Sequence, residues 1–158
     1  MMEYNLNQED WVDILNQSYP IEFGWIGVDS SNQVGFFSTF NQAYTPKKVL
    51  LSFELYVELS ELINNLAEIS SSQLYSKEKG RFDIWHFHSR RGLIGYDYED
   101  AHRKQPERLN RYDLLTVPGT PIDFNSIQGI AQYNPIIPRF DLVFSGNIPF
   151  EDLRRTEL

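Results

Sequence analysis

Two apolar segments separated by a four-residue turn constrain the fold of this chain most strongly. Residues 21–28 and 34–40 are rich in β-branched and aromatic residues, and the sequence between them, DSSN at 29–32, is typical of a turn. We therefore predict a β-hairpin. Apolar residues occupy both alternating sets of positions along it, so both faces of the hairpin are expected to be buried by other parts of the chain.

Length and composition limit what can surround this hairpin. The chain has 158 residues, which suits a single globular domain over 1–158, and 41% of them are hydrophobic, enough for a substantial core. It contains no cysteine, which rules out a disulfide scaffold and any Cys-ligated zinc or iron–sulfur site. The net charge of −8 argues against nucleic acid as a partner, because proteins that bind it carry basic patches.

The rest of the chain mixes helices and strands without regular alternation. A short helix is expected over 7–15, ended by Pro20, and the clearest helix over 49–69, where leucines and isoleucines form one stripe. Further strands are expected at 82–89, 93–99, 112–117 and 140–144, a short helix after the N-cap Asp123, and a final turn at 149–153. This pattern predicts an α+β fold: a mainly antiparallel β-sheet of about five to six strands, one long amphipathic helix and short flanking helices.

The excess of negative over positive charge lies entirely in one half of the sequence. Residues 1–76 contain ten acidic and two basic residues, whereas residues 77–158 contain twelve of each. On the expected long helix, the face opposite the apolar stripe carries four glutamates and no basic residue: Glu54, Glu58, Glu61 and Glu68. Like charges at this spacing repel one another, so the pattern slightly destabilises the helix. The face either keeps the protein soluble or docks a basic partner.

The N-terminal half of the sequence also indicates where in the cell the protein is located. No Lys or Arg occurs in residues 1–46, whereas a secretory signal begins with basic residues and a mitochondrial presequence contains arginines. No stretch approaches the roughly 20 apolar residues of a membrane span. We therefore expect a cytoplasmic protein without membrane association.

Two histidines offer a possible metal site. If residues 82–89 and 93–99 formed a hairpin, His86, His88, Asp97 and Glu99 would share one face of the sheet, a ligand set that suits iron, manganese or zinc. The other interpretation is a polar outer face with an ion pair across the strands, and Arg90 on that face would repel a cation. The sequence contains no nucleotide-binding, nucleophile-elbow or metalloprotease motif, so no cofactor and no catalytic residue is expected.

An acidic and aromatic cluster, YDYED at 96–100, has the composition of surfaces that bind basic proteins. Tyrosine supplies rigid contact area, and carboxylates such as Asp97, Glu99 and Asp100 accept bidentate hydrogen bonds from arginine. These three residues therefore join the four glutamates as candidate partner-binding residues.

Two stretches carry a family resemblance. WIGVD at 25–29 followed by VGFFST at 34–39, and GLIGYDYEDAHR at 92–103 followed by Tyr112 and Pro118, resemble segments of small bacterial proteins of the immunity-protein type. The resemblance implies a cytoplasmic, non-enzymatic protein that binds a cognate toxin domain and occludes it. It carries over no catalytic residue. Two other functions stay open from the residues alone: a metal-dependent enzyme, and a subunit of a larger assembly.

Overall fold

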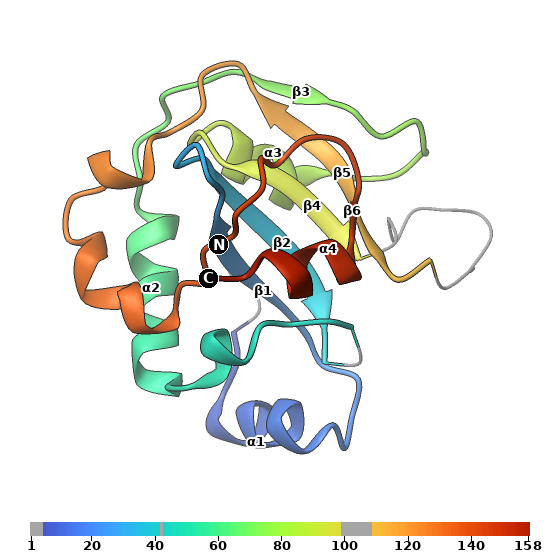
Figure 1. Cartoon of the computed structure of the whole chain (residues 1–158), viewed down its shortest axis with the longest axis vertical. Coiled ribbons are helices and arrows are strands. Elements are labelled where there is room, and N and C mark those ends of the chain that lie inside the picture. The colour runs from blue at the N-terminus through green and yellow to red at the C-terminus, as the bar shows by residue number, and fades with distance from the viewer. Residues whose placement is uncertain (1–4, 42, 99–108) are drawn as a thin grey trace.

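The centre of the computed structural model is a curled mixed sheet (Figure 1). The structure describes residues 5–41, 43–98 and 109–158. The strands lie in the order β1–β2–β4–β5–β3, and β6 also pairs with β5. Their bounds are β1 Glu22–Val28, β2 Val34–Phe40, β3 Ser72–Leu74, β4 Ile94–Tyr98, β5 Arg111–Pro118 and β6 Ile148–Pro149.

Helices and 3₁₀ turns alternate irregularly with these strands. The α-helices are α1 Gln8–Asn16, α2 Phe53–Asn64, α3 Asp83–Ser89 and α4 Phe150–Thr156. The 3₁₀ helices are η1 Lys47–Leu50, η2 Phe124–Ser126 and η3 Ile130–Ile136. The α+β class is thus confirmed. The sheet is mixed, because the chain passes from β2 through α2, β3 and α3 and returns as β4 parallel to β2, while the other strand pairs are antiparallel.

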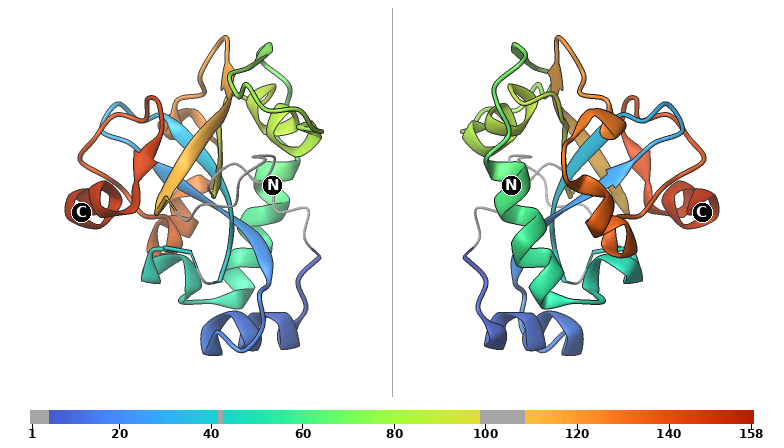
Figure 2. Two further views of the ribbon diagram at one scale, coloured as in Figure 1. Left: turned by 90° about the vertical axis from the view of Figure 1, so that its right-hand side faces the viewer. Right: turned by 90° about the vertical axis from the view of Figure 1, so that its left-hand side faces the viewer.

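The hairpin predicted from the two apolar segments is confirmed as β1 and β2, and both of its faces are covered (Figure 2). Helices α2 and α3 lie on one side of the sheet. There the Tyr56 hydroxyl donates a hydrogen bond to the carbonyl of Gly24 at 2.5 Å, and Trp85 Nε1 donates to the carbonyl of Tyr96 at 3.0 Å. The C-terminal segment with α4 lies on the other side, where the Phe144 ring meets the edge of the Tyr96 ring.

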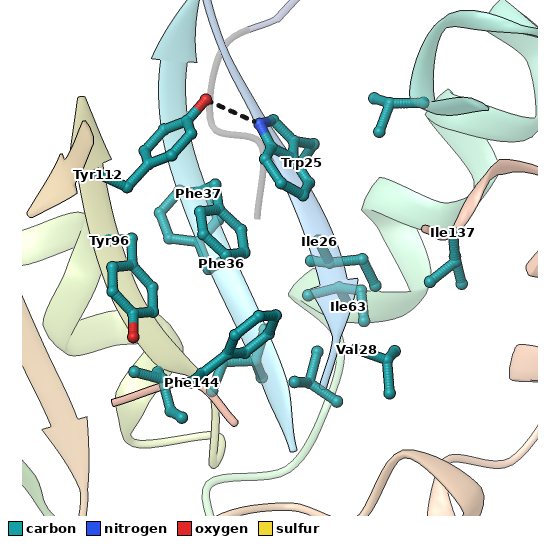
Figure 3. Packing of buried hydrophobic residues seen from close by; sticks show 14 of the residues in the cluster. Trp25, Ile26, Val28, Phe36, Phe37, Ile63, Tyr96, Tyr112, Ile137 and Phe144 are labelled. Atoms are coloured by element: carbon teal, nitrogen blue, oxygen red, sulfur yellow. Dashed lines mark hydrogen bonds between the residues drawn. The ribbon is translucent and has the colours of Figure 1, made fainter. Parts of the chain in front are cut away.

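Stacked aromatic rings form the core on this C-terminal side (Figure 3). Phe37 lies between Trp25 and Tyr96, nearly parallel to both, with ring centroids 4.1 Å and 4.9 Å away. The buried Tyr112 hydroxyl accepts a hydrogen bond from Trp25 Nε1 at 3.2 Å and donates to the carbonyl of Tyr44 at 2.7 Å. Burial raises the pKa of Tyr112, so this hydroxyl stays protonated and able to donate.

The helix expected over 49–69 is shorter in the structure, where α2 covers only Phe53–Asn64 and is preceded by η1. Ser52 caps the start of α2, its Oγ accepting the N–H of Leu55 at 3.2 Å. At the other end the Asn65 side chain donates to the carbonyl of Glu61 at 2.8 Å, so α2 ends at Asn64. Asparagine and serine compete for backbone hydrogen bonds and favour helix ends, which outweighs the leucine periodicity here.

The expected strand at 82–89 is also wrong, because this segment forms α3. Its aromatic residues resemble a strand in composition. However, Trp85, His88 and Ser89 are buried together, which is helical spacing. The buried Ser89 hydroxyl lies 2.7 Å from Thr116 Oγ1 on β5, which attaches the helix to the sheet.

The expected strand at 140–144 does not form, and the segment expected as a turn at 149–153 comprises the last residue of β6 and the start of α4. Residue 140 makes only an isolated bridge. The rings of Phe140 and Phe144 instead lie over Gly27 and Gly35, where an added Cβ would come within 2.9 Å and 3.0 Å of them. The glycines of the hairpin thus make room for aromatic side chains from the end of the chain.

Asp29 in the β1–β2 turn joins this turn to the C-terminal segment. The carboxylate is 3% exposed and accepts hydrogen bonds from the backbone N–H groups of Ser31, Gln33 and Phe144 at 2.8–2.9 Å and from Gln33 Nε2 at 2.9 Å. We expect Asp29→Ala to lower the free energy of unfolding by about 2–4 kcal/mol, because buried donors lose a charged acceptor. Urea denaturation measures this.

The matched control for Asp29 is Asp123→Ala. Asp123 also accepts a backbone N–H, that of Asn125 at 2.7 Å, but its side chain is exposed. Its loss is expected to cost about 1 kcal/mol, as for an ordinary helix cap. If the two variants lowered the free energy of unfolding equally, burial of the Asp29 carboxylate would not add to its stabilising effect, and the prediction would be contradicted.

Candidate functional site

Three of the four predicted glutamates form a ridge along the outer side of α2. Glu54, Val57, Glu58 and Glu61 follow one another at i, i+3, i+4 and i+7, so they lie on one side of the helix, and we call them the α2 ridge. The three glutamates are exposed, and Val57 between them is 37% exposed. No Lys or Arg in the described ranges forms an ion pair with these three carboxylates.

The ridge is held rigidly from beneath. On the inner side of α2, Tyr56, Leu59 and Ile63 are buried in the core. The ring of Trp11 on α1 packs against Tyr56 with centroids 5.0 Å apart. A helix anchored in this way holds the attachment points of its exposed side chains at fixed relative positions, which favours specific recognition.

Helix α1 adds negative charge at the same end of the molecule. Its outer side carries the exposed Glu9 and the partly buried Asp13 beside Val12 and Leu15, which are 46% and 52% exposed. Asn7 and Asp10 cap the helix reciprocally, so its start is well defined. Carboxylates therefore alternate with exposed aliphatic side chains on α1 as they do on the α2 ridge.

The carboxylates of the ridge contribute to the raised pKa of a neighbouring tyrosine. Burial, and then the negative charges of Glu58 and Glu61, raise the pKa of Tyr133 on η3. Three uncompensated carboxylates on one side of a helix produce a local negative potential, which would attract a cationic group from outside.

The fourth predicted glutamate lies elsewhere. Glu68 follows the end of α2, and its carboxylate lies 3.5 Å from Arg90 Nε and 3.7 Å from Arg91 Nη1. The expectation of four glutamates without a basic residue is therefore wrong for Glu68. Its partners are more than 20 residues away along the chain, so no local pattern could indicate them.

The predicted cluster at 96–100 is only partly described. Asp97 is 5% exposed within the sheet, where it is the cross-strand neighbour of Asp113, itself 4% exposed. Arg111 Nε lies 2.6 Å from Asp113 Oδ1. The structure therefore buries Asp97 in the sheet and does not expose it as part of an outer surface. Glu99 and Asp100 lie outside the described residues.

The histidines do not share a face. His86 and His88 are two residues apart on α3, which points them to nearly opposite sides of a helix. His86 Nδ1 lies 2.6 Å from Ser72 Oγ, whereas His88 is fully buried against the ring of Phe36. The supposed hairpin that would bring His86, His88 and Asp97 onto one face of the sheet therefore does not form. Over residues 5–41, 43–98 and 109–158, no three His, Asp or Glu side chains form a group that could hold a metal ion.

A hollow beside the α2 ridge escaped prediction. It has a volume of about 170 Å³ and lies between the N-terminal segment and α2. Leu6, Val57, Glu61 and Asn64 are among its lining residues. Of these, only Glu61 was predicted as a site residue. The hollow itself could not be predicted, because helical periodicity does not show which distant segment lies alongside α2.

Comparisons with protein-family models, with curated proteins and with solved structures each find no match for this chain. In the part of the chain that the structure describes, no helix combines the length and apolar character needed to cross a membrane.

Proposed function

We propose that this protein is a non-enzymatic binding protein of the immunity type, which binds and neutralises a basic bacterial toxin domain in the cytoplasm. One observation carries the proposal: three exposed glutamates, without cationic partners among the described residues, surround an exposed valine on a firmly anchored helix. A solvated helix face gains little from such a pattern, because its like charges repel.

The composition of the ridge suits a protein partner. Val57 gives the centre of the ridge an apolar contact, and the glutamates around it can pair with lysines or arginines. Toxins that cleave nucleic acid present basic surfaces, because their substrate is a polyanion. Carboxylates placed where phosphates would lie block such a surface directly.

The negative charge of this protein also favours rapid association with a basic partner. Complementary charge steers two proteins together and raises the association rate, which matters when a toxin must be caught before it acts. The net charge of −8, concentrated in the first 76 residues, supplies this attraction over a distance.

The experiment uses the proteins encoded by the genes adjacent to the one for this chain. Each basic one is expressed in a bacterial host, with and without this protein, and growth is recorded. We expect one of them to arrest growth, co-expression to restore it, and the two purified proteins to form a complex that weakens as salt rises. A growth-arresting neighbour that this chain neither binds nor relieves would contradict the proposal.

A further inference from the structure

The hollow beside the α2 ridge has walls of two kinds. Leu6 from the N-terminal segment and the half-exposed Val57 provide apolar surface. Glu61 and Asn64, one helical turn apart on α2, provide oxygen acceptors. An apolar wall that leads to oxygen atoms matches a side chain with an aliphatic stem and a cationic head.

Neither acceptor is paired within the part of the chain that the structure describes. The carboxylate of Glu61 is exposed and has no cation within ion-pair distance among the described residues. Asn64 Oδ1 is buried, and no donor in the described ranges reaches it. A buried oxygen without a donor is unfavourable, so a ligand that supplies an N–H group there gains from it.

A second hollow of the same volume shows the contrast. It lies beside α4 and has Asp152 and Arg155 in its lining. There the Asp152 carboxylate already lies 3.4 Å from the Arg155 guanidinium, so its charge is compensated within the chain. The hollow at Glu61 lacks such an internal cation among the described residues.

From this arrangement we infer that the hollow between the N-terminal segment and α2 is a socket for one arginine side chain of the basic partner. The guanidinium pairs with the Glu61 carboxylate and donates to Asn64 Oδ1, while its stem lies along Leu6 and Val57. This inference rests on the proposed function and names the group on the partner that the site recognises.

Arginine fits the socket better than lysine. The planar guanidinium carries five N–H donors in a fixed fork, so it can reach two acceptors on neighbouring helical turns at once. A lysine ammonium is a compact charge that is more strongly hydrated, and it lacks the fixed fork of donors that can bridge two acceptors. The socket therefore distinguishes between the two cations, whereas a diffuse negative potential does not.

The test is an NMR titration of the full ¹⁵N-labelled chain with N-acetyl-arginine amide at low salt. We expect saturable shifts at the backbone amides of Val57, Glu61 and Asn64, and binding of N-acetyl-lysine amide that is about 5-fold weaker or more. Unsaturable shifts spread over both helices, with no preference for arginine, would overturn the socket.

The variants separate the socket from general charge. Glu61→Gln is expected to weaken arginine binding about 10-fold, and Glu58→Gln, the same change on the same helix outside the hollow, less than about 2-fold. Asn64→Leu removes the buried acceptor and is expected to weaken binding by about 5-fold, with the melting temperature measured beside it to verify folding. Equal effects of the Glu61 and Glu58 changes would overturn the socket. The growth experiment judges the proposed function separately.

Discussion

Replacing Phe37 by alanine is expected to lower the free energy of unfolding by about 3–5 kcal/mol, as for other fully buried phenylalanines. Phe37 is 0% exposed and lies stacked between Trp25 and Tyr96. It also meets Phe144 and Tyr112 edge to face, with ring centroids 5.4 Å and 5.0 Å away. Its loss therefore opens a cavity among the rings that it contacts. The free energy of unfolding of a typical domain is only about 5–15 kcal/mol, so this loss would remove a large part of it.

Chemical denaturation followed by tryptophan fluorescence measures this change, because Trp25 is in direct contact with the replaced ring. Phe37→Leu is the matched control. It keeps most of the volume and is expected to cost about 1.5 kcal/mol or less. If alanine and leucine lowered stability equally, the stacked geometry rather than filled volume would be the source of the effect.

Reversing the three charges of the α2 ridge is expected to slow association with the basic partner by about 10- to 1,000-fold at low ionic strength. The variant is Glu54→Lys/Glu58→Lys/Glu61→Lys. All three positions are exposed, so the fold is expected to persist. The reversal turns local attraction into repulsion where the partner docks. Stopped-flow kinetics with the growth-arresting partner identified above measure the association rate, and circular dichroism verifies the helix content.

The control changes the net charge equally at positions away from the ridge. Glu22→Lys/Asp141→Lys/Glu151→Lys also replaces three exposed carboxylates. Both triple variants raise the net charge of −8 by the same amount, so any difference between them reports the position of the charge. A control that slowed association as much as the ridge variant would show that overall charge alone attracts the partner.

Elements with strong local signals were predicted correctly. The hairpin of β1 and β2 follows from apolar runs around a turn, and α1 follows from the helical spacing of its apolar residues. The cap at Asp123 and the strand β5, which ends at Pro118, likewise depend on residues close together in sequence. In these places local preference and tertiary packing agree, which is typical of foldable sequences.

Prediction failed where packing against a distant segment decides the structure. The seven residues of α3 are rich in aromatic residues and too short for a clear period, and they are helical because Trp85 and Ser89 dock together onto β4 and β5. Residues 140–144 form no strand, because Phe140 and Phe144 fill the spaces left by glycines more than 100 residues earlier.

The candidate site divides in the same way. The three ridge glutamates were predicted, because their exposure follows from helical periodicity around an apolar stripe. The partners of Glu68, the burial of Asp97 and the position of Leu6 beside Glu61 depend on contacts between segments far apart in sequence. No local pattern contains that information.

The sequence by itself determined the buried hairpin, the acidic N-terminal half and the ridge on α2, because turn chemistry, charge and helical spacing act over a few neighbouring residues. Only the tertiary structure decided that His86 and His88 point apart, that Glu68 is paired with arginines, and that a hollow with a buried acceptor adjoins the ridge. These features arise when the sheet and its covering segments pack closely, and close packing depends on the whole chain at once.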